Sequence, residues 1–456
     1  MSDKPNIIFI FSDQQRWDTV GCYGQELDIT PNLDQMAAEG VKFENAFTCQ
    51  PVCGPARAVL QTGKYATETG NYRNHIALPQ DAKTIAHWFT EADYRVGYIG
   101  KWHLASNGGE SNIDIGKEFN HRTDPVPLEY RGGWKDRWLV GDALEYTSHP
   151  FAGHFFDENM NKVEFEGYRV DRQTDFVLDY LEEQEKDEPF FLFVSYLEPH
   201  HQNDQNEYVG PEGSKEKYKN YEVPEDLKGK EGDWEENYPD YLGCCASLDK
   251  NVGRIRQQLE KQGLAENTLI IYTSDHGSHF RTRNREYKRS CHEASIHVPM
   301  IAYGPGFKGG KNIEELVSLI DIPPTLLESI DLEVPDYMQG KPLQSIVSEE
   351  DKEWRNEVFI QISESHVGRA IRNKKWKYSV KAPKADGGLD PDSDLYVEDF
   401  LYNLEDDPYE KNNLVNDPDY KEIREKLKKR LKNKMKKAGE KIPEILSKKD
   451  FEGVEN

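Results

Sequence analysis

A cysteine at position 53 stands where a turn leads into a helix-like segment. In PVCGPARAVLQTG, residues 51–63, it lies two positions before a proline and four before an arginine. Because helix-forming composition starts only after Gly54-Pro55, the thiol is expected beside a helix N-terminus, where backbone N–H groups favour a bound anion. The thiol could act as a thiolate nucleophile, or it could be the precursor of a modified residue.

Two other short stretches supply metal ligands. Asp13 and Gln14 follow the apolar run 6–11, and Asp275 and His276 follow the run 268–274. Three oxygen ligands and one imidazole nitrogen suit a hard divalent cation, calcium or magnesium, better than zinc. Such an ion would polarise a bound anionic group and hold it in place.

Four β-like runs end in side chains that can bind a metal or transfer a proton. These endings are Ser12-Asp13-Gln14, Lys101-Trp102-His103, His200-His201 and Asp275-His276-Gly277. Helix-like stretches such as 30–40 and 81–93 alternate with the runs, which predicts an α/β fold with a large, mostly parallel sheet flanked by helices. Ligands bind at the carboxyl ends of the strands in such sheets, so the four endings should converge on one crevice.

The sequence pattern changes in the last quarter of the chain. We expect a catalytic α/β domain over residues 1–340 and a smaller α+β subdomain over residues 341–456, with an antiparallel sheet and a terminal helix at about 418–438. Apolar residues recur at every fourth position of that helix, at Ile423, Leu427, Leu431 and Met435. We interpret its many lysines as the solvated side of a helix packed on the small sheet.

Composition excludes several classes of function. The net charge of −25 argues against a general binder of nucleic acid or of anionic membranes. No apolar run is long enough to span a bilayer, and none reads as a signal peptide, so the chain as written is expected in the cytoplasm, or in the periplasm or outside the cell if a signal was removed. Six cysteines in 456 residues are too few for a disulfide framework.

The Cys53 segment resembles the C-x-P-x-R signature of type I sulfatases, the formylglycine-dependent members of the alkaline phosphatase superfamily. Other stretches resemble this family in the same order along the chain: TGKY at 62–65, GKWH at 100–103, EPHH at 198–201, SDHG at 274–277 and LYNLEDDPYEKNNL at 401–414. The likeness extends over about the whole chain. It implies a sulfuric ester hydrolase with the fold expected above.

The resemblance also implies a role for each matching residue. Asp13, Gln14, Asp275 and His276 would hold one calcium ion, and Cys53 would be oxidised to formylglycine by a separate maturation enzyme. Arg57 would steady the hydrated aldehyde, and Lys101, Lys288 and His200 would grip the sulfate, with His200 or Lys288 protonating the leaving alcohol. His103 would be the base that expels sulfate, and Asn74 would touch the anion.

The substrate is expected to be a sulfated carbohydrate. RTRNREYKR, residues 281–289, is a basic stretch in an acidic chain and directly follows the metal-binding motif. Guanidinium groups suit carboxylates and sulfates, so we expect Arg281, Arg283 and Arg285, with His201, to bind an anionic poly- or oligosaccharide. Trp134, Trp138 and Tyr287 could stack on sugar rings. The segments around 198–204 and 275–284 resemble polysaccharide sulfatases, including those that act on ulvan.

Two alternatives belong to other classes. A phosphonate or phosphate ester hydrolase of the same superfamily would share the metal and nucleophile positions, but such relatives tend to lose the lysine and histidine that are present here as Lys101 and His103. A catalytically silent protein that binds an anionic glycan would leave Cys53 as a thiol. The sugar, the position of its sulfate, endo or exo action and the oligomeric state are open at this stage.

Overall fold

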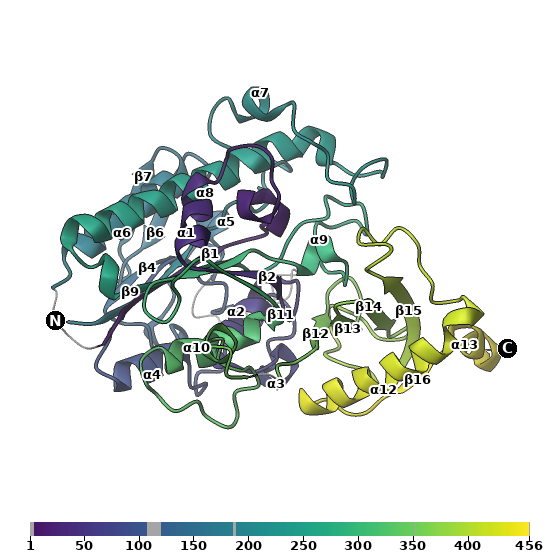
Figure 1. The fold of residues 1–456 in the computed structure, drawn as a ribbon. Helices are drawn as coiled ribbons and strands as arrows, with labels where there is room; N and C mark the ends of the chain where they lie inside the picture. Colours follow the sequence, from purple (N-terminus) through teal and green to yellow (C-terminus); the bar gives the residue numbers. More distant parts are fainter. Residues whose placement is uncertain (1–3, 107–119, 186–187, 352, 456) are drawn as a thin grey trace.

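The computed structural model describes residues 4–106, 120–185, 188–351 and 353–455, and it contains two β-sheets (Figure 1). Eleven strands form the larger sheet. Their order is β11 (Lys311–Ser318), β2 (Val41–Phe47), β10 (Met300–Tyr303), β9 (Thr268–Ser274), β1 (Asn6–Ser12), β8 (Phe190–Ser195), β3 (Arg95–Lys101), β4 (Arg137–Gly141), β6 (Ala152–Phe156) and β5 (Ser148–His149), with β7 (Lys162–Glu166) beside β6.

The centre of the large sheet is parallel, from β9 through β1, β8 and β3 to β4. β10 runs antiparallel to both of its neighbours, and the antiparallel pairs of β6 lie at the other end. The predicted α/β fold with a large, mostly parallel sheet is confirmed. Because the polar strand endings stand on parallel neighbours, they meet at one edge of the sheet.

Helices cover both faces of the large sheet, which explains why β1 reads as a continuous apolar run. Ile7, Phe9 and Phe11 pack on one side with α2 (Cys53–Thr62), α4 (Ile85–Glu91) and α10 (Ile322–Glu328). Ile8 and Ile10 pack on the other side with α1 (Pro31–Glu39), α6 (Arg169–Glu182) and α8 (Trp234–Gln262). Figure 1 shows the two layers below and above the sheet. Short helices stand in the connections: α3 (Ala66–Thr69), α5 (Leu144–Thr147), α7 (Ser214–Tyr218), α9 (Glu293–Ile296) and α11 (Gln344–Val347).

The second sheet belongs to the C-terminal part of the chain and is mainly antiparallel, as expected. Its strands are β12 (Glu357–Ile362), β13 (Gly368–Asn373), β14 (Trp376–Lys381), β15 (Leu395–Asn403) and β16 (Glu444–Leu446), which pairs with β15 in parallel. The predicted terminal helix is α12 (Lys421–Lys437), followed by α13 (Lys448–Glu455). Leu427, Leu431 and Met435 of α12 are buried against this sheet, so the predicted apolar stripe is confirmed.

The division of the chain after residue 340 stays a prediction. Leu343, Ile346 and Val347 pack in the core of the large sheet, whereas the second sheet begins at Glu357. Over the described residues, no helix combines the length and the apolar character that crossing a membrane requires.

Candidate active site

Two neighbouring parallel strands bring the first pair of acidic side chains together. β1 and β9 are paired through Ser12 and Ser274, so Asp13 and Asp275 follow at the same level of the sheet. The backbone N–H of Asp275 donates to the carbonyl of Ser12 at 3.2 Å, and that of Gln14 donates to Oδ1 of Asp275 at 2.9 Å. Both carboxylates are fully buried at this strand edge.

Cys53 begins helix α2 and points its thiol at the two carboxylates. Its Sγ lies 3.4 Å from Oδ1 of Asp13 and 3.4 Å from Nε2 of His276, and the cysteine is 1% exposed. One ligand atom each from Asp13, Cys53, Asp275 and His276 can be chosen so that all four lie within 4.8 Å of one another. Four donors this close could hold a metal ion.

The cluster concentrates negative charge that a cation would relieve. Burial and the neighbouring Asp13 raise the pKa of Asp275 to about 7. Burial also acts to raise the pKa of Asp13, but the surrounding cations, Lys101 first among them, hold it well below its ordinary value. Oδ2 of Asp275 is buried and accepts no hydrogen bond from the described residues. These residues fit a divalent cation, because it would neutralise both carboxylates and satisfy the orphaned oxygen.

Gln14, the remaining predicted ligand, lines a cavity together with Cys53. Its backbone adopts a left-handed conformation with φ of 72°, and its Nε2 donates to the hydroxyl of Tyr208. A left-handed non-glycine residue is a local strain that the surrounding structure has to hold in place. The turn after β1 therefore places Asp13 and Gln14 in the same site, although successive residues of a strand would point apart.

Two cations, Arg57 and Lys101, contact the carboxylate of Asp13. Nη2 of Arg57 and Nζ of Lys101 lie 3.1 and 2.9 Å from Oδ2 of Asp13. Arg57 also donates through Nη1 to the carbonyl of Lys101 at 2.8 Å and to Oγ of Ser195 at 2.7 Å. Both cations are buried, so their charges act at short range in a poorly screened environment.

Lys288 and His200 stand on the open side of the thiol. Nζ of Lys288 is 2.8 Å from Sγ of Cys53 and 3.3 Å from Nε2 of His200. Burial and Asp13 act to raise the pKa of Cys53, but Lys288 and Lys101 outweigh them and bring it down to about 7. Position 53 is thus an environment that stabilises negative charge.

His103 lies in the same pocket as a neutral base. Burial, and then the charge of Lys101, lower its pKa to about 3. Neither ring nitrogen has a hydrogen-bond partner among the described residues, and the backbone is left-handed with φ of 58°. A neutral imidazole whose nitrogens have no partner among the described residues can accept a hydrogen bond from a group bound in the pocket.

Part of this site lines a cavity of about 410 Å³. Of the predicted site residues, the cavity is lined by Gln14, Cys53, Asn74, His103, His200, His201, Arg281 and Lys288. Asn74 accepts a hydrogen bond from the N–H of Gly54 at 2.9 Å, and Tyr287 packs on His201 with ring centroids 4.4 Å apart. The structure therefore brings most of the predicted residues together.

Some predicted substrate contacts lie elsewhere. Trp134 and Trp138 are fully buried around Tyr98 in the core, so the expectation that they stack on sugars is wrong. Arg285 is exposed and does not line the cavity at Cys53. Among the lining residues that were not predicted, His75 and Arg122 lie in loops, and Glu145 and Tyr146 lie in the short helix α5. Arg289, the last residue of the basic stretch 281–289, lines the cavity as well.

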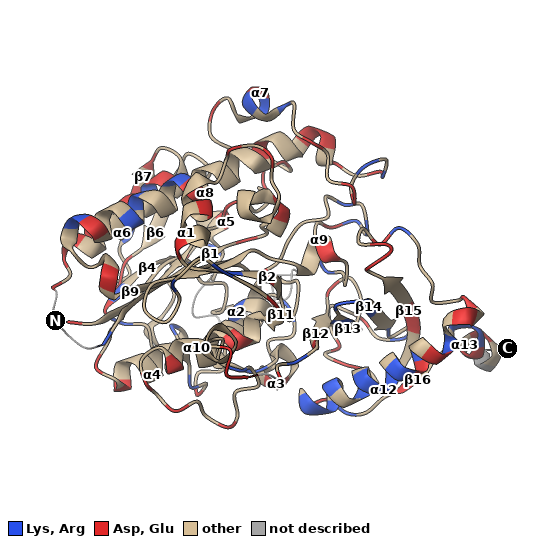
Figure 2. Ribbon diagram, in the orientation of Figure 1, with Lys and Arg blue, Asp and Glu red and all other residues tan. Residues whose placement is uncertain are grey.

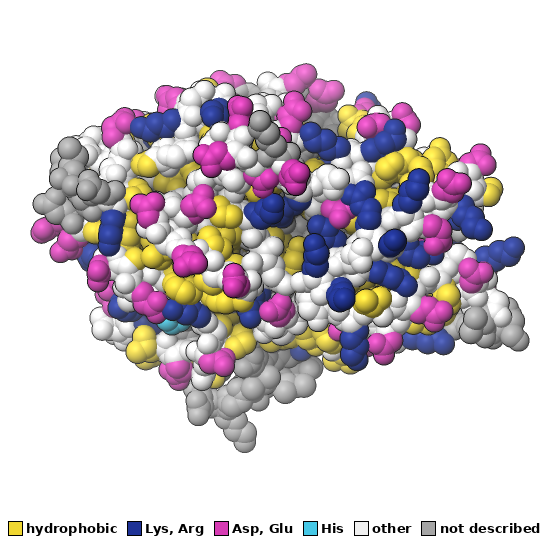
Figure 3. Space-filling model, turned by 60° about the horizontal axis from the view of Figure 1, so that its bottom comes forward, with side chains coloured by type: hydrophobic (Ala, Val, Ile, Leu, Met, Phe, Trp, Pro, Cys, Tyr) yellow, Lys and Arg dark blue, Asp and Glu magenta, His cyan; other side chains and the backbone are white. Residues whose placement is uncertain are grey.

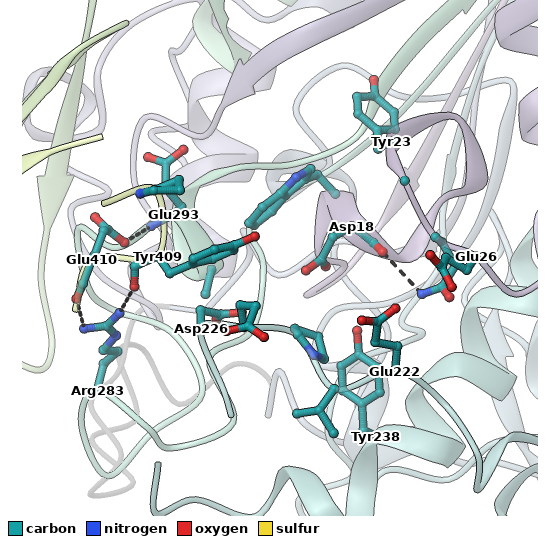
Figure 4. A pocket seen from close by; sticks show the side chains of 18 residues that line it. Asp18, Tyr23, Glu26, Glu222, Asp226, Tyr238, Arg283, Glu293, Tyr409 and Glu410 are labelled. Carbon is teal, nitrogen blue, oxygen red and sulfur yellow. Dashed lines mark hydrogen bonds between the residues drawn. The ribbon is translucent and has the colours of Figure 1, made fainter. Parts of the chain in front are cut away.

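Arg283 lines a second pocket, of about 310 Å³, in place of the first (Figure 4). Its guanidinium donates to the backbone carbonyls of Tyr409 and Glu410, both at 2.9 Å. Carboxylates predominate in this pocket, among them Asp18 and Glu222. The role of Arg283 seen here is to tie the loop after β9 to the C-terminal part of the chain.

Comparison with known proteins agrees with this arrangement. A family model described as Sulfatase matches residues 5–332. The chain belongs to the sulfatase family. A second model, described as N-sulphoglucosamine sulphohydrolase, C-terminal, matches residues 285–437 of this sulfatase. The expectation of a sulfuric ester hydrolase is confirmed.

Individual relatives resemble this sulfatase along nearly its whole length. An ulvan-active sulfatase from Formosa agariphila is 30% identical and covers 96% of this chain and 82% of its own length. An arylsulfatase from Clostridium perfringens is 29% identical, over 93% of both chains. The solved structure of BT4656 in complex with its substrate D-glucosamine-2-N,6-O-disulfate has a TM-score of 0.79 at 22% identity, covers 96% of this chain and 98% of its own, and shows the shared fold.

Proposed function

We propose that this sulfatase removes sulfate from a sulfated poly- or oligosaccharide, with residue 53 converted to formylglycine and one calcium ion bound beside it. The observation that carries the proposal is the position of Cys53. Its Sγ stands at the base of an open polar cavity, between the carboxylates of Asp13 and Asp275 and the ammonium group of Lys288.

The proposed metal ligands are Asp13, Gln14, Asp275 and His276. Hard oxygen donors predominate in this set, which supports calcium over a softer ion. A bound calcium ion would supply Lewis-acid polarisation of the sulfate oxygens and fix the orientation of the ester. Arg57 and Lys101 keep the carboxylate of Asp13 ionised and in place, because their cationic groups lie 3.1 and 2.9 Å from its Oδ2.

Formylglycine would supply a hydrated aldehyde with two hydroxyls. One could attack the sulfur, and loss of the proton of the other would re-form the aldehyde as the C–O bond to sulfate breaks. Arg57 lies 3.8 Å from Oδ2 of Asp275 and steadies the residue that receives the nucleophile's proton. The Lys288–His200 pair supplies the proton for the departing alcohol, since its nitrogens stand 3.3 Å apart beside position 53. His103, neutral and unpartnered, takes the proton of the second hydroxyl.

The rim of the cavity supports a sugar substrate. Arg122, Arg281 and Arg289 bring positive charge to the mouth, and Tyr146 and Tyr287 bring aromatic rings. Guanidinium groups bind sulfate and carboxylate in a bidentate manner, and tyrosines combine an apolar face with a polar edge. The names of the relatives point the same way: one acts on ulvan, and BT4656 was solved with a disulfated glucosamine. More specifically, we propose that the substrate is an ulvan-type glycan.

The state of residue 53 tests the mechanism. The chain should be produced together with a formylglycine-generating enzyme, and the peptide containing residue 53 should be weighed by mass spectrometry. We expect the mass of an aldehyde, with Cys53→Ala as the inactive control. A plain thiol in an active preparation would overturn the proposed nucleophile.

Paired substrates test the reaction and its substrate class. We expect aryl sulfate to be hydrolysed in preference to the matching aryl phosphate, and sulfated oligosaccharides in preference to both. A panel of defined sulfated saccharides would then identify the sugar. Faster turnover of the phosphate ester would contradict the proposal.

A further inference from the structure

A groove of about 500 Å³ lies on the C-terminal part of the molecule, beside α12. Two half-buried tryptophans, Trp354 and Trp376, line it. Trp376 packs against Tyr420, which directly precedes α12, with ring centroids 5.7 Å apart. Partly exposed aromatic rings are suited to cover the apolar face of a ligand.

Cations complete the lining of this groove. They are Arg355, Lys374, Lys375 and Arg430. The groove also contains two carboxylates, Glu315 and Asp351, and the latter is paired with Lys341 at 3.0 Å. Arg430 belongs to α12, so the groove continues onto the surface of that helix.

Helix α12 carries an excess of positive charge along this edge (Figure 2). Its 17 residues contain eight lysines and two arginines against two glutamates. Carboxylates of the small sheet hold four of these cations: Glu398 pairs with Arg424 and Lys428, and Glu357 pairs with Arg430 and Lys434. Within the described part of the chain, six lysines of α12 have no ion pair: Lys421, Lys426, Lys429, Lys432, Lys436 and Lys437.

Two of the free lysines of α12, Lys426 and Lys437, border the groove. Lys426, Arg430 and Lys437 follow one another at spacings of four and seven residues, so they share one side of the helix. Since Arg430 lines the groove, this side forms its edge. Figure 3 shows Lys and Arg side chains gathered on the half of this face that holds the C-terminal part. We call the groove and these lysines together the α12 groove.

Helix stability accounts for only part of this charge, because lysines in the last turn of α12 interact favourably with the helix dipole. Like charges three or four positions apart destabilise a helix, and Lys429, Lys432 and Lys436 form such a series. Solubility does not require it either, because the chain already carries a net charge of −25. A concentrated positive ridge on an acidic protein points to an anionic ligand.

Strand β12 connects the α12 groove with the active site. Glu357, its first residue, pairs with Arg430, whereas Glu364, just beyond its last, accepts a hydrogen bond from the N–H of Asn74 at 2.6 Å. The six residues of β12 span about 17 Å, and two further residues lead to Glu364. A ligand that reaches both places must therefore be a polymer.

We propose that the α12 groove binds a second stretch of a sulfated polysaccharide and thereby holds polymeric substrate on the enzyme. The proposal rests on the proposed function for the identity of the glycan. Sulfate groups can pair with the free lysines of α12, and sugar rings can stack on Trp354 and Trp376. The tryptophans favour a sugar chain over nucleic acid or a lipid surface, and binding at two sites of one chain raises the effective concentration of the second contact.

Direct binding to the full chain tests the proposal. The protein carries Cys53→Ala, so it cannot consume the probe, and the probe is dextran sulfate, titrated at several salt concentrations. Reversal of four exposed lysines of α12, K426E, K429E, K436E and K437E, should weaken binding about tenfold or more. The matched control reverses four exposed lysines far from α12, K162E, K217E, K250E and K261E, and should leave binding nearly unchanged. Equal losses in the two variants would overturn the proposal.

Trp376→Ala separates sugar binding from simple charge attraction. It should weaken binding of dextran sulfate and leave the weaker binding of polyglutamate unchanged. The proposal is wrong if Trp376→Ala has no effect, or if duplex DNA or phosphatidylserine vesicles bind as tightly as dextran sulfate. Unchanged melting temperatures confirm that the variants fold. Because the assay needs no turnover, it remains readable even if residue 53 proves to be a thiol and the proposed function fails.

Discussion

Nζ of Lys288 lies 2.8 Å from Sγ of Cys53, although 235 positions separate the two residues in the chain. Removal of this ammonium group would take away a donor aimed at the atom that reacts. We expect Lys288→Met to lower kcat about 10²–10³-fold with a smaller change in KM, because the contact strengthens as charge develops in the transition state. Steady-state kinetics with an aryl sulfate measure both. Arg289→Met is the control, since Arg289 stands at the cavity rim, and it should act mainly on KM.

His103 is predicted to act after the alcohol has left. The variant His103→Asn should therefore release about one equivalent of alcohol per active site in a rapid phase and then stall. Stopped-flow measurement with a chromogenic aryl sulfate resolves the two phases. His75→Asn is the control, because the His75 ring lies 5.8 Å from that of His103. It should not stall after the first release of alcohol if the effect belongs to His103 alone. A His103 variant that is slow from the first turnover would assign this residue to the first step.

Removal of the metal should destabilise the protein as well as inactivate it. Without a cation, Asp13, Asp275 and the thiol of Cys53 stand together in a buried site. We expect dialysis against a chelator to lower the melting temperature, and calcium to restore it with a dependence on concentration that follows mass action. Magnesium should restore it less well. A melting temperature that changes with neither calcium nor magnesium would contradict a metal at this site.

Asp142 gives the fold a dependence on pH that does not involve the metal ligands. Burial raises the pKa of this carboxyl to about 7, although it accepts hydrogen bonds from the N–H groups of Leu104 and Ala105. The folded state thus binds the proton more tightly than the unfolded state, and its stability falls as pH rises from about 4 to 7. Asp142→Asn removes this loss.

The stability of Asp142→Asn relative to the parent should be about 2–4 kcal/mol greater at pH 8 than at pH 4. Urea unfolding at a series of pH values measures the difference. Asp157→Asn is a suitable control, because Asp157 lies near the surface and its pKa is lowered. A constant difference between parent and Asp142→Asn at all pH values would contradict the role assigned to burial.

The sequence predicted the centre of the site because strand endings carry positional information. Asp13 and Asp275 follow parallel runs, and parallel neighbours end at the same edge of the sheet, so their meeting follows from the fold class. The buried position of Cys53 at the start of α2 follows from its turn and its helix-forming successors. The same reasoning placed the apolar stripe of α12, whose spacing is regular.

The rim of the cavity could not be predicted in the same way. Arg281, Arg283 and Arg285 alternate in a loop without regular structure, and only the folded chain shows that Arg281 faces the cavity while Arg283 ties down Tyr409 and Glu410. Tryptophan in a loop reads equally well as a sugar platform or as core, and Trp134 is core. Glu145 reaches Lys101 at 3.5 Å from a short helix that has no distinctive pattern.

All ten residues of α2 are buried, including Cys53 at its first position. If residue 53 is converted to formylglycine as proposed, the modifying enzyme has to reach it before this helix packs against the sheet. Oxidation of residue 53 would then compete with the folding of α2, and a molecule that folds first would retain its thiol. The specific activity of a preparation would accordingly depend on the fraction of chains that were modified before they folded. It would vary between preparations even though each modified molecule has the same turnover rate.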